Sequence, residues 1–399
     1  MNMNKIAFNI LTVPVLAVLA VSCGGQDEIY KEWVKKGGYD YPAKAINLSS
    51  VIGYQNVIVN WEKPMDPAVR TATLFWDNYA KSIDVDYADY PDGKVSIEVG
   101  ELEDRSYTFD IVNYDDVGNK SLAAEITVSP YGDGWMVSRS ERTVTSARMK
   151  GRDAKIVMSK ATDEMVATRF RYKNLQDEWV ESETVLKPGE NEVTFKDAMK
   201  GKRFEYSSSF CPKAGKDTVW RTWTKSVDGI SYQIDGSRWN VTATNGQYFG
   251  INTPEKIFDG RYDRPAYSWH SSKSDNNKQA FPKILSVDTQ TSAGEEFAFT
   301  GFTFCENNTA ASLRYIKDYT IYVGSSYYNP DDADYLKNFG IPFIGGTLST
   351  SADQYSVNVT QGATGRYMAI VFKNSWNADD GFIDLWEFIP YGYIPSLAD

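Results

Sequence analysis

Short runs of alternating apolar and polar residues make up most of this chain. Residues 57–61 (VIVNW) place Val59 and Trp61 on one face, and residues 95–99 and 107–111 repeat the two-residue period. That period is typical of a strand with one buried face. Glycine, asparagine, aspartate and proline separate the runs, and no long amphipathic helix stands out. The pattern therefore predicts an all-β chain built from β-sandwiches.

The turn residues divide the chain into three modules after an N-terminal segment. In the first module, 41–133, the expected strands are 57–61, 73–76, 95–99, 107–111 and 124–128. In the second, 134–230, they are 154–158, 168–172, 191–195, 204–210 and 219–224. The third module is 231–399. With 42% hydrophobic and 14% aromatic residues, the chain has ample material for separate packed cores.

The N-terminal segment reads as an export signal. Lys5 precedes an apolar run, residues 6–21, that ends in small residues and is shorter than a membrane span with anchoring flanks. Ala20-Val21-Ser22-Cys23 resembles the lipobox of bacterial lipoproteins. The resemblance implies removal of signal peptide 1–22 and acylation of Cys23; an ordinary cleaved signal with a chance cysteine is the alternative.

Residues 23–40 are expected to form a tether, with one short helical turn at 30–36. The stretch Gly24-Gly25-Gln26-Asp27-Glu28 is similar to the acidic signal that sends lipoproteins of the Bacteroidetes type to the cell surface. A lipid anchor would hold the protein without a transmembrane segment. We therefore expect an outer-membrane lipoprotein exposed at the cell surface.

Charge and cysteine content narrow the function. The net charge of −11 and the pI near 4.9 argue against a nucleic-acid partner, which needs clustered Lys and Arg. Besides Cys23 the chain has Cys211 and Cys305, which fall in different modules. We expect them to be buried thiols rather than a disulfide framework.

The first two modules resemble immunoglobulin-like domains. Trp61 in an early strand, the late Tyr-x-Phe-x-Ile of residues 107–111 and the Gly118-Asn119 turn together resemble a fibronectin type III or immunoglobulin-like sandwich. Residues 30–133 look like the N-terminal domain of an uncharacterised family of Bacteroidetes lipoproteins, which implies a fold and no chemistry. Alternation through residues 204–210 favours a second immunoglobulin-like sandwich. Both are expected to act as spacers.

The third module carries six landmarks of another family, in order. They are Ile257-Phe258-Asp259-Gly260, Trp269-His270-Ser271, the strand 282–288, the strand 319–324, Arg366-Tyr367-Met368-Ala369-Ile370 and the closing strand 386–392. Together they resemble the discoidin-like family, also called coagulation factor 5/8 type C domains, which includes galactose-binding-like carbohydrate-binding modules. The resemblance implies a jelly-roll β-sandwich that binds a carbohydrate at one loop end.

Sugar rings offer C–H faces and hydroxyl groups, so a site needs an aromatic platform and a few directed polar groups. Relatives that bind galactose-type sugars use a His, an Arg, an Asn and an aromatic residue from such loops. By loop position, the ligand-binding candidates are Tyr248, His270, Asn307, Arg314, Asn374 and Trp376. For His270 a structural hydrogen bond and a sugar contact stay equally open, and Trp269 is expected in the core.

The resemblance also implies a structural Ca²⁺ beside the Asp-Gly turn. Its carboxylates would come from Asp259, Asp263 and Glu387, as suits a hard cation. The alternative is that Asp259 caps the turn.

Enzyme functions are disfavoured. The single histidine, His270, excludes the usual His-rich zinc sites, and no nucleophile-elbow motif or phosphate-cradling glycine loop is present. We predict non-catalytic carbohydrate binding accessory to glycan capture, with outer-membrane uptake partners. The alternative is a protein-binding adhesin or an assembly subunit of an outer-membrane complex; a glycan hydrolase is a third, weaker candidate.

Overall fold

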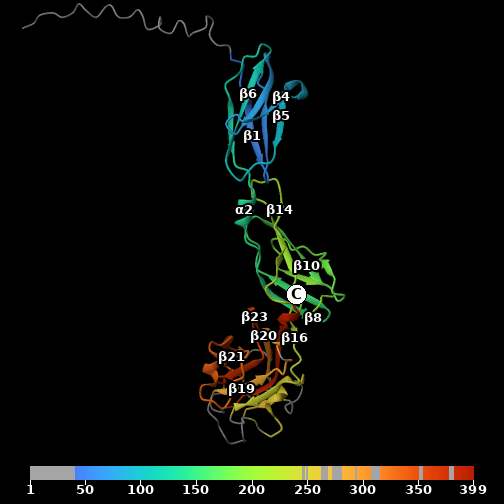
Figure 1. Cartoon of the computed structure of the whole chain (residues 1–399), viewed down its shortest axis with the longest axis vertical. Helices are drawn as coiled ribbons and strands as arrows, with labels where there is room; N and C mark the ends of the chain where they lie inside the picture. The colour runs from blue at the N-terminus through green and yellow to red at the C-terminus, as the bar shows by residue number, and fades with distance from the viewer. Residues whose placement is uncertain are drawn as a thin grey trace, which may run out of the picture. The chain divides into compact units, whose positions relative to one another are not determined.

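The computed structural model describes residues 41–244, 248, 250–261, 268–271, 281–292, 294–306, 315–349, 354–376 and 382–399. The chain divides into two compact units, Met1–Tyr131 and Gly132–Asp399. Strands dominate both units (Figure 1). Within the described residues, no helix has the length and apolar character needed to cross a membrane. The predicted signal, the tether and Cys23 lie outside the described residues.

The first unit is a two-sheet sandwich with the strand order of a fibronectin type III domain. Its elements are β1 (Ile46–Ile52), β2 (Val57–Glu62), β3 (Val69–Trp76), β4 (Lys81–Asp86), η1 (Tyr87–Asp89), β5 (Lys94–Val99), β6 (Tyr107–Asp115) and β7 (Ala124–Val128). One sheet has the order β1-β2-β5 and the other β4-β3-β6-β7. Trp61 Nε1 donates to the Tyr87 hydroxyl at 3.0 Å inside the core, which fixes the early-strand tryptophan.

The second sandwich begins the other unit and repeats this arrangement. Its elements are α2 (Asp133–Val137), β8 (Val144–Lys150), β9 (Asp153–Met158), β10 (Met165–Lys173), β11 (Trp179–Glu181), β12 (Glu192–Phe195), β13 (Glu205–Phe210), β14 (Val219–Trp220) and β15 (Thr224–Lys225). The sheets are β12-β9-β8 and β11-β10-β13-β14, with β15 also on β13. The single strand expected at 219–224 is therefore wrong, because β14 and β15 pair with opposite ends of β13.

The third module, the head, packs two five-stranded sheets face to face. Its elements are β16 (Tyr232–Gln233), β17 (Asn240–Ala243), η3 (Pro254–Phe258), β18 (Trp269–His270), β19 (Lys283–Asp288), β20 (Phe297–Glu306), β21 (Asp318–Gly324), α3 (Tyr335–Phe339), β22 (Ile344–Thr347), β23 (Gln354–Gly365), β24 (Tyr367–Phe372), β25 (Asp384–Tyr393) and η5 (Pro395–Leu397). The sheets are β16-β25-β20-β23, with β18 on β25, and β17-β19-β24-β21-β22. Trp269, Phe302 and Phe388 are buried between them. The predicted fold class of two immunoglobulin-like sandwiches and a discoidin-like jelly roll is confirmed.

The second sandwich and the head meet at a hydrogen-bonded joint. Ser231 N donates to Ala147 O at 2.9 Å, and Met149 N donates to Ser231 O at 2.8 Å. The Tyr393 hydroxyl donates to Asp228 Oδ1 at 2.9 Å. Figure 1 shows β8 of the second sandwich beside β16 of the head. The expected boundary at 230/231 thus falls inside a tight contact, and the two modules form one compact unit.

Candidate functional site

Strands β18 and β20 end, and strand β25 begins, at one end of the head. His270 ends β18 and lies opposite Asp384 at the start of β25. Glu306 ends β20 and lies opposite Leu385, the residue that also pairs with Trp269. We call this end of the head the loop end, and we assign to it His270, which ends β18, and Asn374 and Trp376, which follow β24 (Tyr367–Phe372).

His270 is held by neighbours on β25. Its Nε2 lies 3.8 Å from Asp384 Oδ1, and its ring centroid is 5.3 Å from that of Phe382. Only 17% of the His270 side chain is exposed. The imidazole and the carboxylate thus present polar atoms side by side, while the phenylalanine ring limits the movement of the imidazole.

Asn374 and Trp376 follow β24 and are fixed in different ways. Asn374 closes the turn, because its Oδ1 accepts from Asp318 N at 2.9 Å and its Nδ2 donates to Asp318 Oδ2 at 2.8 Å. Trp376 is 43% exposed, and its Nε1 donates to Leu348 O at 3.0 Å. Lys317 Nζ lies 4.8 Å from the Trp376 ring centroid. Trp376 is thus a half-exposed aromatic surface anchored along one edge.

Glu306 is a feature of this end that sequence reasoning missed. It is 4% exposed, its Oε1 accepts from Ile316 N at 2.6 Å, and its Oε2 has no hydrogen-bond partner among the described residues. Burial raises the pKa of the carboxyl to about 8. Glu306 therefore ties together the residues that flank segment 307–314. The sequence signal that could have pointed to Glu306 is a charged residue at the end of a mostly apolar run, residues 297–306 (FAFTGFTFCE).

Lys283 adds a buried cation to the same end. It opens β19 opposite Phe372, is fully buried, and its Nζ lies 5.4 Å from the Phe281 ring centroid. Burial lowers the pKa of the ammonium group to about 8. Buried ionisable groups of both signs close to exposed side chains are common at functional sites.

Among the remaining predicted ligand contacts, the structure describes Tyr248. Tyr248 is 42% exposed and lines a different hollow of about 450 Å³ with Glu255 and Asp331, to which His270, Asn374 and Trp376 do not contribute. Asn307 and Arg314 lie outside the described residues. The structure thus brings three of the six candidates into one region and places Tyr248 elsewhere.

The Asp-Gly turn has features of a cation site. Glu387 is 4% exposed; its Oε1 accepts from Gly260 N at 3.2 Å, and its Oε2 has no hydrogen-bond partner among the described residues. Burial, together with the nearby negative charge of Asp259, raises the pKa of Glu387 to about 8. An orphaned buried oxygen beside a second carboxylate fits a hard cation.

The same turn also shows the capping alternative. Asp259 Oδ1 accepts from Arg261 N at 2.9 Å, the pattern of an aspartate that stabilises its own turn. Within the described part of the chain, no group of three or more His, Cys, Asp or Glu side chains is placed to hold a metal ion. Asp263, the third predicted ligand, lies outside that part.

Comparisons with known proteins give a match to one domain model and a set of similar solved structures. The model of a domain of unknown function, DUF4998, matches residues 23–217. No curated protein matches the chain. The function of this domain is unknown, so the match assigns no activity to residues 23–217.

Three similar solved structures are two carbohydrate-binding modules and a SusE-like protein. They are the family 32 carbohydrate-binding module of C. perfringens NanJ in complex with galactose (17% identity, 41% of this chain, 99% of that chain, TM-score 0.32), a SusE-like protein (12%, 63%, 97%, 0.33) and CBM62 from Clostridium thermocellum Xyl5A (18%, 41%, 98%, 0.28). At these identities and TM-scores the likenesses say nothing about the ligand of this chain.

Proposed function

We propose that this protein is a cell-surface lipoprotein that binds carbohydrate, without catalysis, at the loop end of its head. The observation that carries the proposal is the half-exposed indole of Trp376, anchored through Leu348 and lying near Lys317. An aromatic surface suits the C–H face of a sugar ring, and the polar atoms of His270 and Asp384 suit its hydroxyl groups. In this proposal, Trp376, His270 and Asp384 hold a glycan that a nearby uptake system then imports.

The anchor in this proposal is Cys23, acylated after removal of residues 1–22. It rests on the Ala20-Val21-Ser22-Cys23 pattern and the acidic residues that follow. Metabolic labelling of cells with a fatty-acid analogue tests it. The label should enter the wild-type chain and not Cys23→Ser; equal labelling of the two would contradict the anchor.

Affinity electrophoresis of the chain from residue 24 onward, through gels containing host or plant polysaccharides, tests the binding function. Retention should occur on at least one polysaccharide and fall at least about tenfold in Trp376→Ala, because the aromatic platform is removed. Trp179→Ala is the matched control, since Trp179 lies on β11 of the second sandwich and is similarly exposed, at 46%. Tyr248→Ala should reduce retention less than Trp376→Ala. Absence of retention on every polysaccharide would contradict the function.

A protein partner is the second candidate function, and a surface of the second sandwich favours it. The guanidinium of Arg169 lies 4.4 Å from the Trp220 ring centroid and 4.7 Å from that of Trp223, and Arg171 lies 4.7 Å from Trp223 and 5.5 Å from Trp179. Tryptophan and arginine are enriched in protein interfaces. Pull-down from envelope extract with Trp220→Ala as the comparison distinguishes the two functions, because free sugar should not compete with a protein partner.

A structural Ca²⁺ at the Asp-Gly turn is part of the same proposal. Asp259 and Glu387 would supply oxygen ligands, with Asp263 as the third carboxylate. The ion would neutralise two carboxylates, one of them buried, and so stabilise the turn that leads to the loop end.

A further inference from the structure

A second hollow lies at the joint, away from the loop end. It encloses about 330 Å³, within the range of about 300–1,000 Å³ typical of small-molecule sites. Strand β8 forms one side, and segment 227–231 with β20 and β23 of the head forms the other. The second sandwich and the head belong to one compact unit, so the hollow is a feature of that unit.

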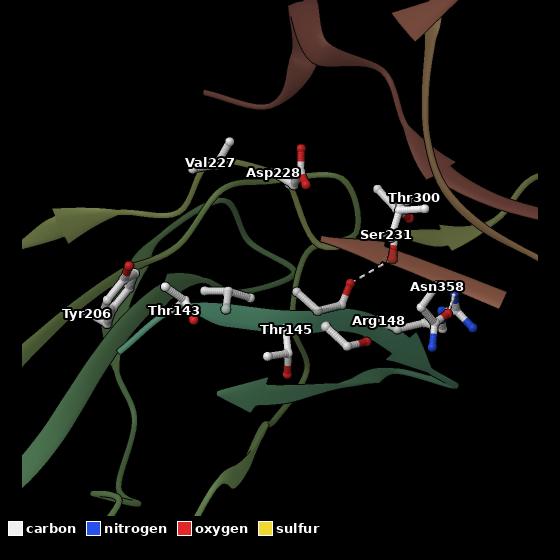
Figure 2. Close-up of a pocket in the computed structure, with 14 residues that line it drawn as sticks. Thr143, Thr145, Arg148, Tyr206, Val227, Asp228, Ser231, Thr300 and Asn358 are labelled. Carbon is white, nitrogen blue, oxygen red and sulfur yellow. Dashed lines mark hydrogen bonds between the residues drawn. The ribbon is translucent and has the colours of Figure 1, made fainter. Parts of the chain in front are cut away.

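Hydroxyl-bearing and aliphatic side chains line this joint pocket. Figure 2 shows Thr143 and Thr145 along β8, and Ser231 and Thr300 on the facing wall. Arg148 lies at one end and Tyr206 at the other. Aliphatic side chains, including those of Val144, Val227 and Val359, complete the lining. A lining with many hydroxyls and one guanidinium suits a ligand that carries several hydroxyl groups and one negative charge.

Arg148 is the group that sets the charge of that ligand. Its guanidinium lies 3.7 Å from the Tyr391 ring centroid, and its Nη2 donates to Asn358 Oδ1 at 2.5 Å. Its Nε is buried and has no hydrogen-bond partner among the described residues. None of the described carboxylates forms an ion pair with it, so a neutral amide and an aromatic ring are the partners that the described chain supplies.

A partly buried cation without a counter-charge is unfavourable, and an anion that reaches it is correspondingly stabilised. Asp228, the carboxylate in the lining, is already engaged. Its Oδ1 accepts from the Tyr393 hydroxyl at 2.9 Å and its Oδ2 accepts from Gly362 N at 3.4 Å. The counter-charge for Arg148 is therefore left to a ligand.

The head is shaped to admit this arginine. At Gly301 in β20, an added Cβ would stand 2.7 Å from Arg148 Nη2 and 2.5 Å from Val357 O. Such distances are closer than real contacts allow, so any side chain at Gly301 would displace the guanidinium. The position of Arg148 thus depends on residues of both modules.

We propose that the joint pocket binds a small polyhydroxylated carboxylate, the size of one uronic acid residue, with its carboxylate on Arg148. The hydroxyls of Ser231, Thr145 and Thr300 donate to backbone carbonyls, so their oxygens are left to accept from the ligand's hydroxyls. The valine side chains contact the C–H face of the ligand. This site shares no residue with the loop end, so it goes beyond the carbohydrate binding proposed above and does not depend on it.

Titration calorimetry of the chain from residue 24 onward tests the pocket, with D-galacturonate and D-glucuronate as probes. D-galactose carries the hydroxyl groups without the carboxylate, and acetate carries the carboxylate without the hydroxyl groups, so the two compounds separate these contributions to binding. At least one uronate should bind, acetate should bind at least about tenfold more weakly, and Arg148→Met should weaken uronate binding by at least about tenfold. Arg152→Met is the matched control, because Arg152 is exposed at the end of the same hairpin.

Two further variants keep the test decisive if Arg148→Met does not fold. Arg148→Lys keeps the positive charge but loses the planar fork, and Val227→Trp adds bulk at a lining residue that is 68% exposed. Both should weaken uronate binding at least about tenfold. Wild-type affinity in both variants, or no uronate binding by the wild-type chain, overturns the proposal. Binding that is lost in Trp376→Ala but kept in Arg148→Met also overturns it and assigns the uronate to the loop end.

Discussion

The two ends of the head use their polar groups differently. At the joint, hydrogen bonds connect residues far apart in the sequence: Arg148 with Asn358, and Asp228 with Tyr393. At the loop end, Glu306 binds the backbone of a residue ten positions away and leaves one carboxylate oxygen without a described partner. The comparison indicates that hydrogen bonds at the joint connect the two modules, with Arg148 Nε left without a described partner, whereas the bonds of Glu306 stay within the head.

The largest expected effect concerns pH and Glu306. Its pKa of about 8 in the folded chain lies above the ordinary 4.5, so between these values the folded chain keeps a proton that the unfolded chain has released. The free energy of unfolding should therefore fall as pH rises through that window, by up to about 1.4 kcal/mol per pH unit for this group. Denaturant unfolding at about pH 5 and about pH 8 measures the slope.

Glu306→Gln should reduce this slope, because the amide does not titrate, while Glu387, whose pKa is also raised to about 8, keeps its own contribution. Glu183→Gln is the control, since Glu183 is exposed on the second sandwich, and it should leave the slope unchanged. Equal slopes in Glu306→Gln and the wild-type chain would show that the loop end does not hold a destabilising buried charge.

Ca²⁺ should give the next largest effect, at Glu387. If the ion binds the folded turn, a concentration about 100-fold above its dissociation constant adds about 2.7 kcal/mol to the free energy of unfolding. Glu387→Gln should abolish that gain. Glu306→Gln is the sharper comparison, because Glu306 is equally buried and no described carboxylate contributes to its pKa shift; it should keep the gain. Stabilisation that survives Glu387→Gln would place the ion elsewhere.

Alternation along the sequence predicted the fold where strands have one buried face, as in β2 (buried at every second residue). It failed for β20, which was not predicted, because this central strand is covered on both faces and its apolar run has no period of two. Of the site candidates, His270 came from an ordered landmark and Trp376 from its loop position, and their role in binding stays a prediction. Tyr248 could not be placed, because its hollow depends on packing against Asp331, which no local pattern shows.

The joint was beyond sequence reasoning for a related reason. Arg148 sits in an ordinary alternating strand, and its partner Asn358 is 210 positions away. The position of the Arg148 guanidinium also requires a glycine at residue 301, which belongs to the head. Such long-range pairings follow from how two modules dock, and docking is not encoded in the periodicity of either module.

Tyr393→Phe should give a smaller effect, at the joint. It removes the hydroxyl that donates to Asp228 Oδ1, and burial raises the pKa of Tyr393 to about 12, so the hydroxyl is protonated at neutral pH. Loss of one hydrogen bond to a charged acceptor should lower the free energy of unfolding by about 1.5–3 kcal/mol. Tyr327→Phe, at a tyrosine that is 63% exposed, is the control. No difference between the two variants would contradict the role given to the joint's hydrogen bonds.

The smallest effect is expected from Lys225→Met, also at the joint. Lys225 Nζ lies 2.7 Å from Asp399 Oδ1, but the two side chains are 47% and 66% exposed, so water and salt screen the attraction. The change in denaturation midpoint should be well below that of Tyr393→Phe and should shrink further in about 0.5 M salt. If Lys225→Met were as destabilising as Tyr393→Phe, the joint would depend on exposed charge. The interpretation of the joint as held by buried hydrogen bonds between the two modules would then be wrong.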